Sequence, residues 1–116
     1  MRLDLRSSPW ERLRFAVRQG CQLRWPSAPH LDGTYSCDQD DIADLRIIAH
    51  DAGSGCGLPF GAAFYSHSDI EGVPRMLTAE QAQSLYVALR DYVLHLRYYT
   101  AGEVTTPPQQ PVIVGE

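Results

Sequence analysis

The longest periodic segment of the chain, residues 78–100, constrains the fold more than any other stretch. Thr78 followed by Gln81 is a capping-box pattern that begins a helix, and Gly102 is a stop signal at the far end. Apolar residues within the segment recur at alternating steps of three and four, which places them on one stripe of a helix. This stripe consists of Ala82, Leu85, Leu89, Tyr92, Leu96 and Tyr99.

A second apolar strip runs beside the first and contains Tyr86, Val93, Val87 and Leu94. One small domain cannot easily cover two faces of the same helix, so this strip favours contact with another chain. Tyrosine suits protein interfaces because its ring is apolar and its tip is polar, although it is equally common at the rim of a core. On this helix we expect partner contacts at Tyr86, Val93, Tyr98 and Tyr99.

Two more helices are indicated before the long one. Ser8, followed by a first-turn proline and a glutamate, predicts a helix over about residues 9–18 that stops at Gly20. Asp38 can cap a further helix, which Gly53 ends. Its apolar stripe is the expected partner of the long helix and consists of Ile42, Leu45, Ala49 and Ala52.

Short β-capable runs separate these helices and suggest two antiparallel hairpins. The first hairpin has a long connection, whereas the second has a turn over residues 66–72 and an edge strand that contains Pro74. Leu3 and Leu5 alternate with charged residues, which indicates either a short strand or a disordered lead-in. The predicted hairpin strands are residues 22–25, 34–37, 62–65 and 73–77.

The predicted architecture is a small single α+β domain over residues 1–103, with two short β-hairpins and three helices, the C-terminal helix being the longest. Residues 104–116 follow as an extended, Pro-rich tail. This tail ends in three β-branched residues, which can add a strand to an exposed sheet edge such as the one near Pro74. We expect the tail to dock on another subunit or partner, the alternative being a disordered terminus. Its expected contact residues are Val112, Ile113 and Val114.

Composition excludes several classes of function. The formal net charge of −4 argues against a nucleic-acid binder, because such proteins usually carry a basic face. No window approaches the length of a transmembrane helix, and the first residues lack the apolar core of a signal peptide. The three cysteines are odd in number and lack zinc-type spacing, so neither a disulfide framework nor a cofactor is expected. A soluble protein made inside the cell is predicted, without membrane or nucleic-acid partners.

Three groups of residues could carry chemistry, and each has a plainer explanation. The acids Asp38, Asp40, Asp41 and Asp44 begin like a calcium loop but lack its glycine and final glutamate, so helix capping accounts for them. The histidines at 30, 50, 67 and 95 are not spaced as metal ligands. Cys56 lies between glycines and could act as a nucleophile if His67 were nearby, but a flexible loop explains the same pattern. No catalytic or metal-binding residue is therefore predicted.

Three runs resemble a tail-associated domain of unknown function from bacteriophages and prophages, found in tail-fibre and tail-assembly proteins. These runs are GTYSCD at residues 33–38, DLRI at residues 44–47 and MLTAEQ at residues 76–81. The resemblance covers about residues 24–101. The chain departs from that family in having Phe-Tyr at residues 64–65, where a tryptophan is common, and in continuing into the Pro-rich tail. The family has no established catalytic residues, so none carries over.

The resemblance implies a non-enzymatic structural or assembly protein of a phage tail. Its partners would be other tail proteins or further copies of itself, as a homo-oligomer, in the host cytoplasm during assembly and in the virion tail. The alternative is a small phage-encoded protein that binds and inhibits a host or defence protein. A third hypothesis, a small hydrolase that uses Cys56, has the weakest support in the sequence.

Overall fold

The structure is a computed structural model that describes residues 8–115, so the alternation at Leu3 and Leu5 lies outside the described residues. It has the predicted α+β class, and its C-terminal helix is the longest element. Two 3-10 turns, η1 (Pro29–Leu31) and η2 (Pro59–Gly61), lie in connections. The helices are α1 (Pro9–Gln19), α2 (Gln39–Gly53) and α3 (Ala79–Thr100); the strands are β1 (Cys21–Arg24), β2 (Gly33–Tyr35), β3 (Tyr65–Ser68), β4 (Pro74–Leu77) and β5 (Val112–Ile113).

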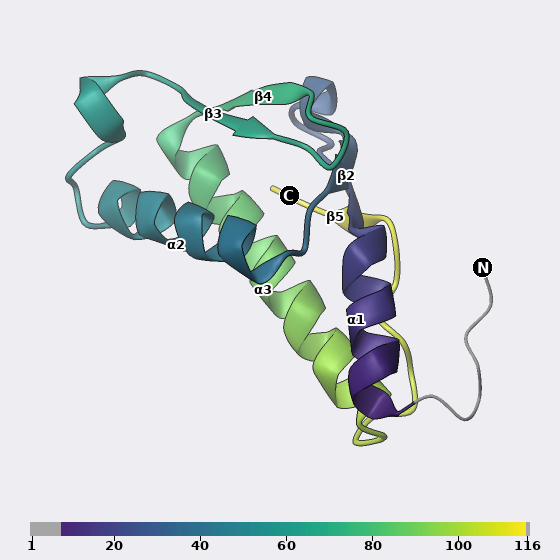
Figure 1. Cartoon of the computed structure of the whole chain (residues 1–116). Helices are drawn as coiled ribbons and strands as arrows, with labels where there is room; N and C mark the ends of the chain where they lie inside the picture. Colours follow the sequence, from purple (N-terminus) through teal and green to yellow (C-terminus); the bar gives the residue numbers. More distant parts are fainter. Residues whose placement is uncertain (1–7, 116) are drawn as a thin grey trace.

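Helix α3 crosses the whole molecule, and the other helices pack against different parts of it (Figure 1). Residues of α2 and α3 line a shared depression near Tyr86, whereas Arg12 of α1 donates a hydrogen bond to the Thr100 carbonyl, 3.1 Å away. The capping box predicted for α3 is present: the Gln81 N–H donates to the Thr78 hydroxyl, and the Thr78 N–H donates to the Gln81 side chain. These bonds fix where α3 begins.

The apolar stripe of α3 was predicted correctly except at its end. Ala82, Leu85, Leu89, Tyr92 and Leu96 are buried, but Tyr99 is 39% exposed. Thr100 takes the next inward position because 3.6 residues complete a helical turn, so a step of four follows Leu96. Its hydroxyl donates to the Leu96 carbonyl at 2.9 Å, which satisfies this buried polar group.

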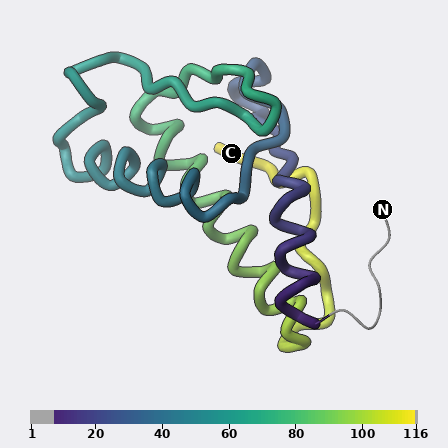
Figure 2. The backbone as a smooth tube through the Cα atoms, viewed as in Figure 1, coloured from purple at the N-terminus to yellow at the C-terminus, as the bar shows by residue number. Residues whose placement is uncertain are grey.

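The first predicted hairpin is present and belongs to a three-stranded sheet of order β2-β1-β5. Strands β1 and β2 pair antiparallel, with Cys21 opposite Tyr35, and β5 joins the other edge of β1 in parallel, with Leu23 opposite Val112. Figure 2 shows how the tail reaches this position by running back beside α1. The sheet therefore joins the early and late parts of the chain.

This pairing corrects the expectation for the tail. The terminal strand does dock on a sheet edge, but the edge is β1 of the same chain and not the edge near Pro74 or another subunit. Val114 is only 3% exposed and belongs to the hydrophobic core, and Val112 is half-buried. Both valines pack within their own chain, and contact between these residues and a partner stays a prediction.

The second hairpin is shifted from its predicted position. Strand β3 covers Tyr65–Ser68, so the strand predicted over residues 62–65 starts too early and the turn predicted over residues 66–72 is too long. Asp69 sets the tight turn, because its Oδ1 accepts hydrogen bonds from the Glu71 and Val73 N–H groups, both at 2.9 Å. An ion pair of 2.9 Å between Asp69 and Arg75 joins the two ends of the turn.

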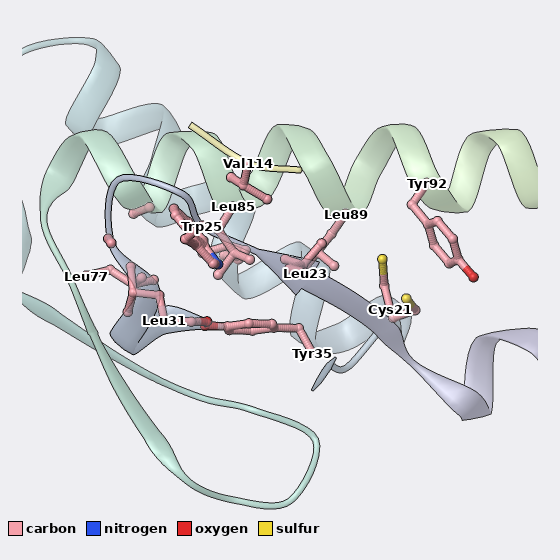
Figure 3. Packing of buried hydrophobic residues seen from close by; sticks show 14 of the residues in the cluster. Cys21, Leu23, Trp25, Leu31, Tyr35, Leu77, Leu85, Leu89, Tyr92 and Val114 are labelled. Atoms are coloured by element: carbon pink, nitrogen blue, oxygen red, sulfur yellow. The ribbon is translucent and has the colours of Figure 1, made fainter. Parts of the chain in front are cut away.

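The hydrophobic core lies between the three-stranded sheet and the helices. Figure 3 shows Leu85 and Leu89 of α3 packed toward the side chains that rise from β1. Tyr35 lies fully buried below them, and its hydroxyl donates to the Leu31 carbonyl at 2.7 Å. Within residues 8–115, no helix combines the length and hydrophobicity needed to cross a membrane.

Candidate interaction surface

A groove of about 560 Å³ lies between α3 and the C-terminal segment. Helix α3 contributes one wall, residues 108–109 and β5 the other. The groove is accessible and combines apolar side chains with amide, carboxylate and imidazole groups. We call it the tail groove; its lining residues are Gln83, Ser84, Val87, Ala88, Asp91, Tyr92, His95, Pro108, Gln109, Val112, Ile113, Val114 and Gly115.

Side-chain hydrogen bonds hold the tail in place and so shape the groove. The Gln110 side chain bridges two elements. Its Oε1 accepts a hydrogen bond from the Gln22 backbone N–H at 2.7 Å, and its Nε2 donates to the Tyr92 hydroxyl at 2.8 Å. The His95 ring nitrogen Nε2 lies 2.8 Å from the Thr106 carbonyl oxygen. Because these bonds join the tail to both β1 and α3, the wall of the groove is fixed on the body of the protein.

The charge state of the groove follows from burial and pairing. Burial raises the pKa of Tyr92 to about 12, with a further contribution from the thiols of Cys21 and Cys37, so its hydroxyl stays protonated near neutral pH. Asp91 is exposed and pairs with Arg90 at 3.0 Å, a solvated contact of little energetic weight. The groove is thus mainly uncharged, which suits a protein contact better than a charged ligand.

The predicted interface residues of α3 are not brought together. Tyr86 is half-buried beside α2, and the Arg90 guanidinium lies 5.7 Å from the centre of its ring. Val93 is also half-buried and lines a separate depression of about 420 Å³ with Trp10 of α1. Tyr98 is exposed near the end of α3. Only the tail residues Val112, Ile113 and Val114, out of the predicted set, line the tail groove.

Val87 and Phe60 are exposed apolar residues outside the predicted contact set. Val87 is 42% exposed and lies in the wall of the tail groove; its place on the second apolar strip was the available signal. Phe60 is fully exposed in η2 and has a φ of 61°, a value that non-glycine residues seldom adopt. Nothing in the local pattern of Pro59, Phe60 and Gly61 distinguished this residue from an ordinary loop residue.

The acid cluster acts as a helix start. Asp38 is the N-cap of α2, and its carboxylate accepts a hydrogen bond from the Asp40 N–H at 3.2 Å. Asp40 and Asp41 lie in the first turn, where their negative charge interacts favourably with the positive end of the helix dipole. Among residues 8–115, no three His, Cys, Asp or Glu side chains are grouped so that they could hold a metal ion.

The three cysteines occupy two different environments. Cys21 and Cys37 are buried, and their mutual hydrogen bond, followed by burial, raises the pKa of the Cys21 thiol far above its ordinary value. A protonated buried thiol is a poor nucleophile. Cys56 is exposed and its Sγ accepts from the Ser54 hydroxyl at 3.5 Å. His67, the base considered for it, has its ring contacts with Tyr35 and Tyr65 instead.

His67 is a buried histidine with an unsatisfied nitrogen. Its ring stacks on Tyr35 with 6.3 Å between ring centres, and in the described part of the chain its Nε2 has no hydrogen-bond partner. Burial lowers the pKa of His67, although the nearby carboxylates Asp41 and Asp44 act in the opposite direction. A neutral ring is therefore favoured in the folded state.

We expect stability to fall as the pH drops below the ordinary histidine pKa of about 6.5, because the unfolded chain then binds a proton that folded His67 resists. His67→Phe keeps the aromatic stack and removes the titration, so its free energy of unfolding should vary less between about pH 7 and 5. Urea unfolding across this range measures the slope. A slope in His67→Phe equal to that of the unmodified chain would refute this assignment.

Comparison of the chain with protein-family models, with curated proteins and with solved structures found no match.

Proposed function

We propose that the chain is a non-enzymatic structural or assembly protein of a bacteriophage or prophage tail that acts through protein–protein contacts. The sequence resemblance at residues 33–38, 44–47 and 76–81 suggests the tail context. The tail groove is the single observation that carries the contact role, because it is open, mainly uncharged and bordered by exposed Val87 and Ile113. Such an apolar surface with a polar rim is typical of protein interaction sites.

The proposed setting is the host cytoplasm during assembly and the virion tail afterwards. A small domain with a fixed groove fits a role as a component of the tail or as an assembly factor. Exposed apolar side chains elsewhere, such as Phe60 and Trp10, offer further contact points.

Mass spectrometry of purified particles and of tail-assembly intermediates tests this proposal. The chain is expected in one of the two, and a phage that lacks its gene should produce fewer complete tails. A gene deletion that leaves tails normal, with the chain absent from both fractions, would overturn the tail role. Tight binding to a host protein under that outcome would instead support an inhibitor.

A further inference from the structure

Strand β5 has an open outer edge. Arg24 is paired with Ile113, and the Val114 N–H donates to the Arg24 carbonyl at 2.8 Å. In a parallel ladder the residues that bond to the neighbouring strand alternate with residues that do not. By this alternation, the N–H and C=O groups of Ile113 point away from β1, toward an edge with which no strand within residues 8–115 pairs.

This edge lacks most of the features that prevent an edge strand from pairing with another chain. Natural edges are commonly guarded by charged side chains, by prolines or by a covering element. Residues 104–115 contain no charged residue, and the whole chain contains no lysine. Pro111 removes one N–H group at the start of the strand, which leaves the groups of Ile113 available. Ile113 itself is 49% exposed.

The tail groove continues the sheet-and-helix packing beyond this edge. Val114 is buried and Val112 half-buried, and both line the groove together with Val87 and Ala88 of α3. One more strand beside β5 would therefore lie over exposed apolar surface of α3. The groove therefore lies where a further strand of the sheet could pack against α3.

We propose that a second copy of the chain completes this layer, with the two β5 strands pairing antiparallel about a two-fold axis at Ile113. In an antiparallel hydrogen-bonded pair, two facing residues exchange both of their N–H···O bonds, so one symmetric contact satisfies both outward groups of Ile113. A two-fold interface brings identical surfaces together, which penalises charge on the axis. The uncharged segment around β5 meets this requirement. The inference deepens the proposed function by naming a second copy as the partner at the groove.

A disulfide-trapping experiment tests the register directly. In the Cys56→Ser background, Ile113→Cys places one thiol on the proposed axis. Facing residues in such a pair have Cα atoms about 5.5 Å apart, which is within the range of a disulfide. Diamide, a mild thiol oxidant, should therefore convert Ile113→Cys rapidly into a covalent dimer on a non-reducing gel. Gln109→Cys is the matched control, since antiparallel pairing carries that exposed residue away from its counterpart.

Light scattering over a concentration series gives the second measurement. The unmodified chain should approach the mass of two chains, whereas Ile113→Pro, which removes the outward N–H, should stay at one. Ile113→Val keeps the N–H and should behave as the unmodified chain. Circular dichroism confirms that each variant is folded. A mass of one chain at every concentration, or equal trapping at positions 109 and 113, would overturn the pairing.

These results are independent of the test of function. A monomer that is still found in tails would refute the pairing and leave the tail role intact. A dimer that is absent from particles and assembly intermediates, with normal tails in its absence, would do the reverse.

Discussion

Leu89→Ala is expected to lower the free energy of unfolding by about 2–5 kcal/mol, as truncations of fully buried leucines do. Leu89 is 1% exposed and lies at the centre of α3. In Figure 3 its side chain points toward Leu23 of β1, so the deleted atoms would leave a cavity where helix and sheet meet. Neighbouring side chains on rigid elements can fill that space only partly, which is why the cost exceeds that of transfer alone.

Leu94→Ala provides the control for this prediction. Leu94 is on the same helix but is 43% exposed, so the same truncation should cost less than about 1 kcal/mol. Urea unfolding followed by circular dichroism gives both values. Equal losses in the two variants would show that the buried stripe of α3 is wrongly assigned.

Gly20→Ala is expected to cost about 2–5 kcal/mol, from backbone strain and crowding together. Gly20 joins α1 to β1 with φ of 75° and ψ of −174°, a combination accessible almost only to glycine. A Cβ atom there would lie 2.8 Å from the backbone oxygen of Tyr35 and 2.7 Å from Cδ1 of Ile70. The Ile70 side chain can rotate, but the Tyr35 carbonyl belongs to β2 and cannot move without disturbing the sheet.

Gly102→Ala separates these two contributions. Gly102 has φ of 81°, but a Cβ atom on it would have no neighbour within 4 Å. Its replacement should therefore cost only the left-handed backbone penalty of about 1–2 kcal/mol. Thermal and urea unfolding of both variants measure the difference. If Gly20→Ala costs no more than Gly102→Ala, the close packing of the α1–β1 junction against β2 is incorrect.

The helices were predictable because their signals are local. Ser8, Asp38 and Thr78 all act as N-caps in the structure, as expected from their spacing to the following residues. The stops at Gly20 and Gly53 also lie within a residue of the helix ends. The N-cap hydrogen bonds join groups only two or three residues apart, so one sequence is sufficient to recognise them.

The sheets and the groove were less predictable because they depend on distant pairings. The apolar run at residues 62–65 had the composition of a strand, but Asp69 and its bonds to Glu71 and Val73 decide where β3 ends. The tail was recognised as a strand that would join an edge, yet sequence alone does not show which edge is free. For the same reason the tail groove, formed by α3 and residues 108–115, had no signature of its own.

The parallel pairing of β5 with β1 also has a consequence for the order of folding. The hydrogen bond between Gln22 and Gln110 joins residues 88 positions apart in the chain. Closing so large a loop costs conformational entropy before the contact contributes stability, so such pairings tend to form late. Helices and hairpins built from near neighbours can assemble first, and the tail then closes over them. Destabilising substitutions at Val114 should consequently increase the unfolding rate more than they decrease the folding rate.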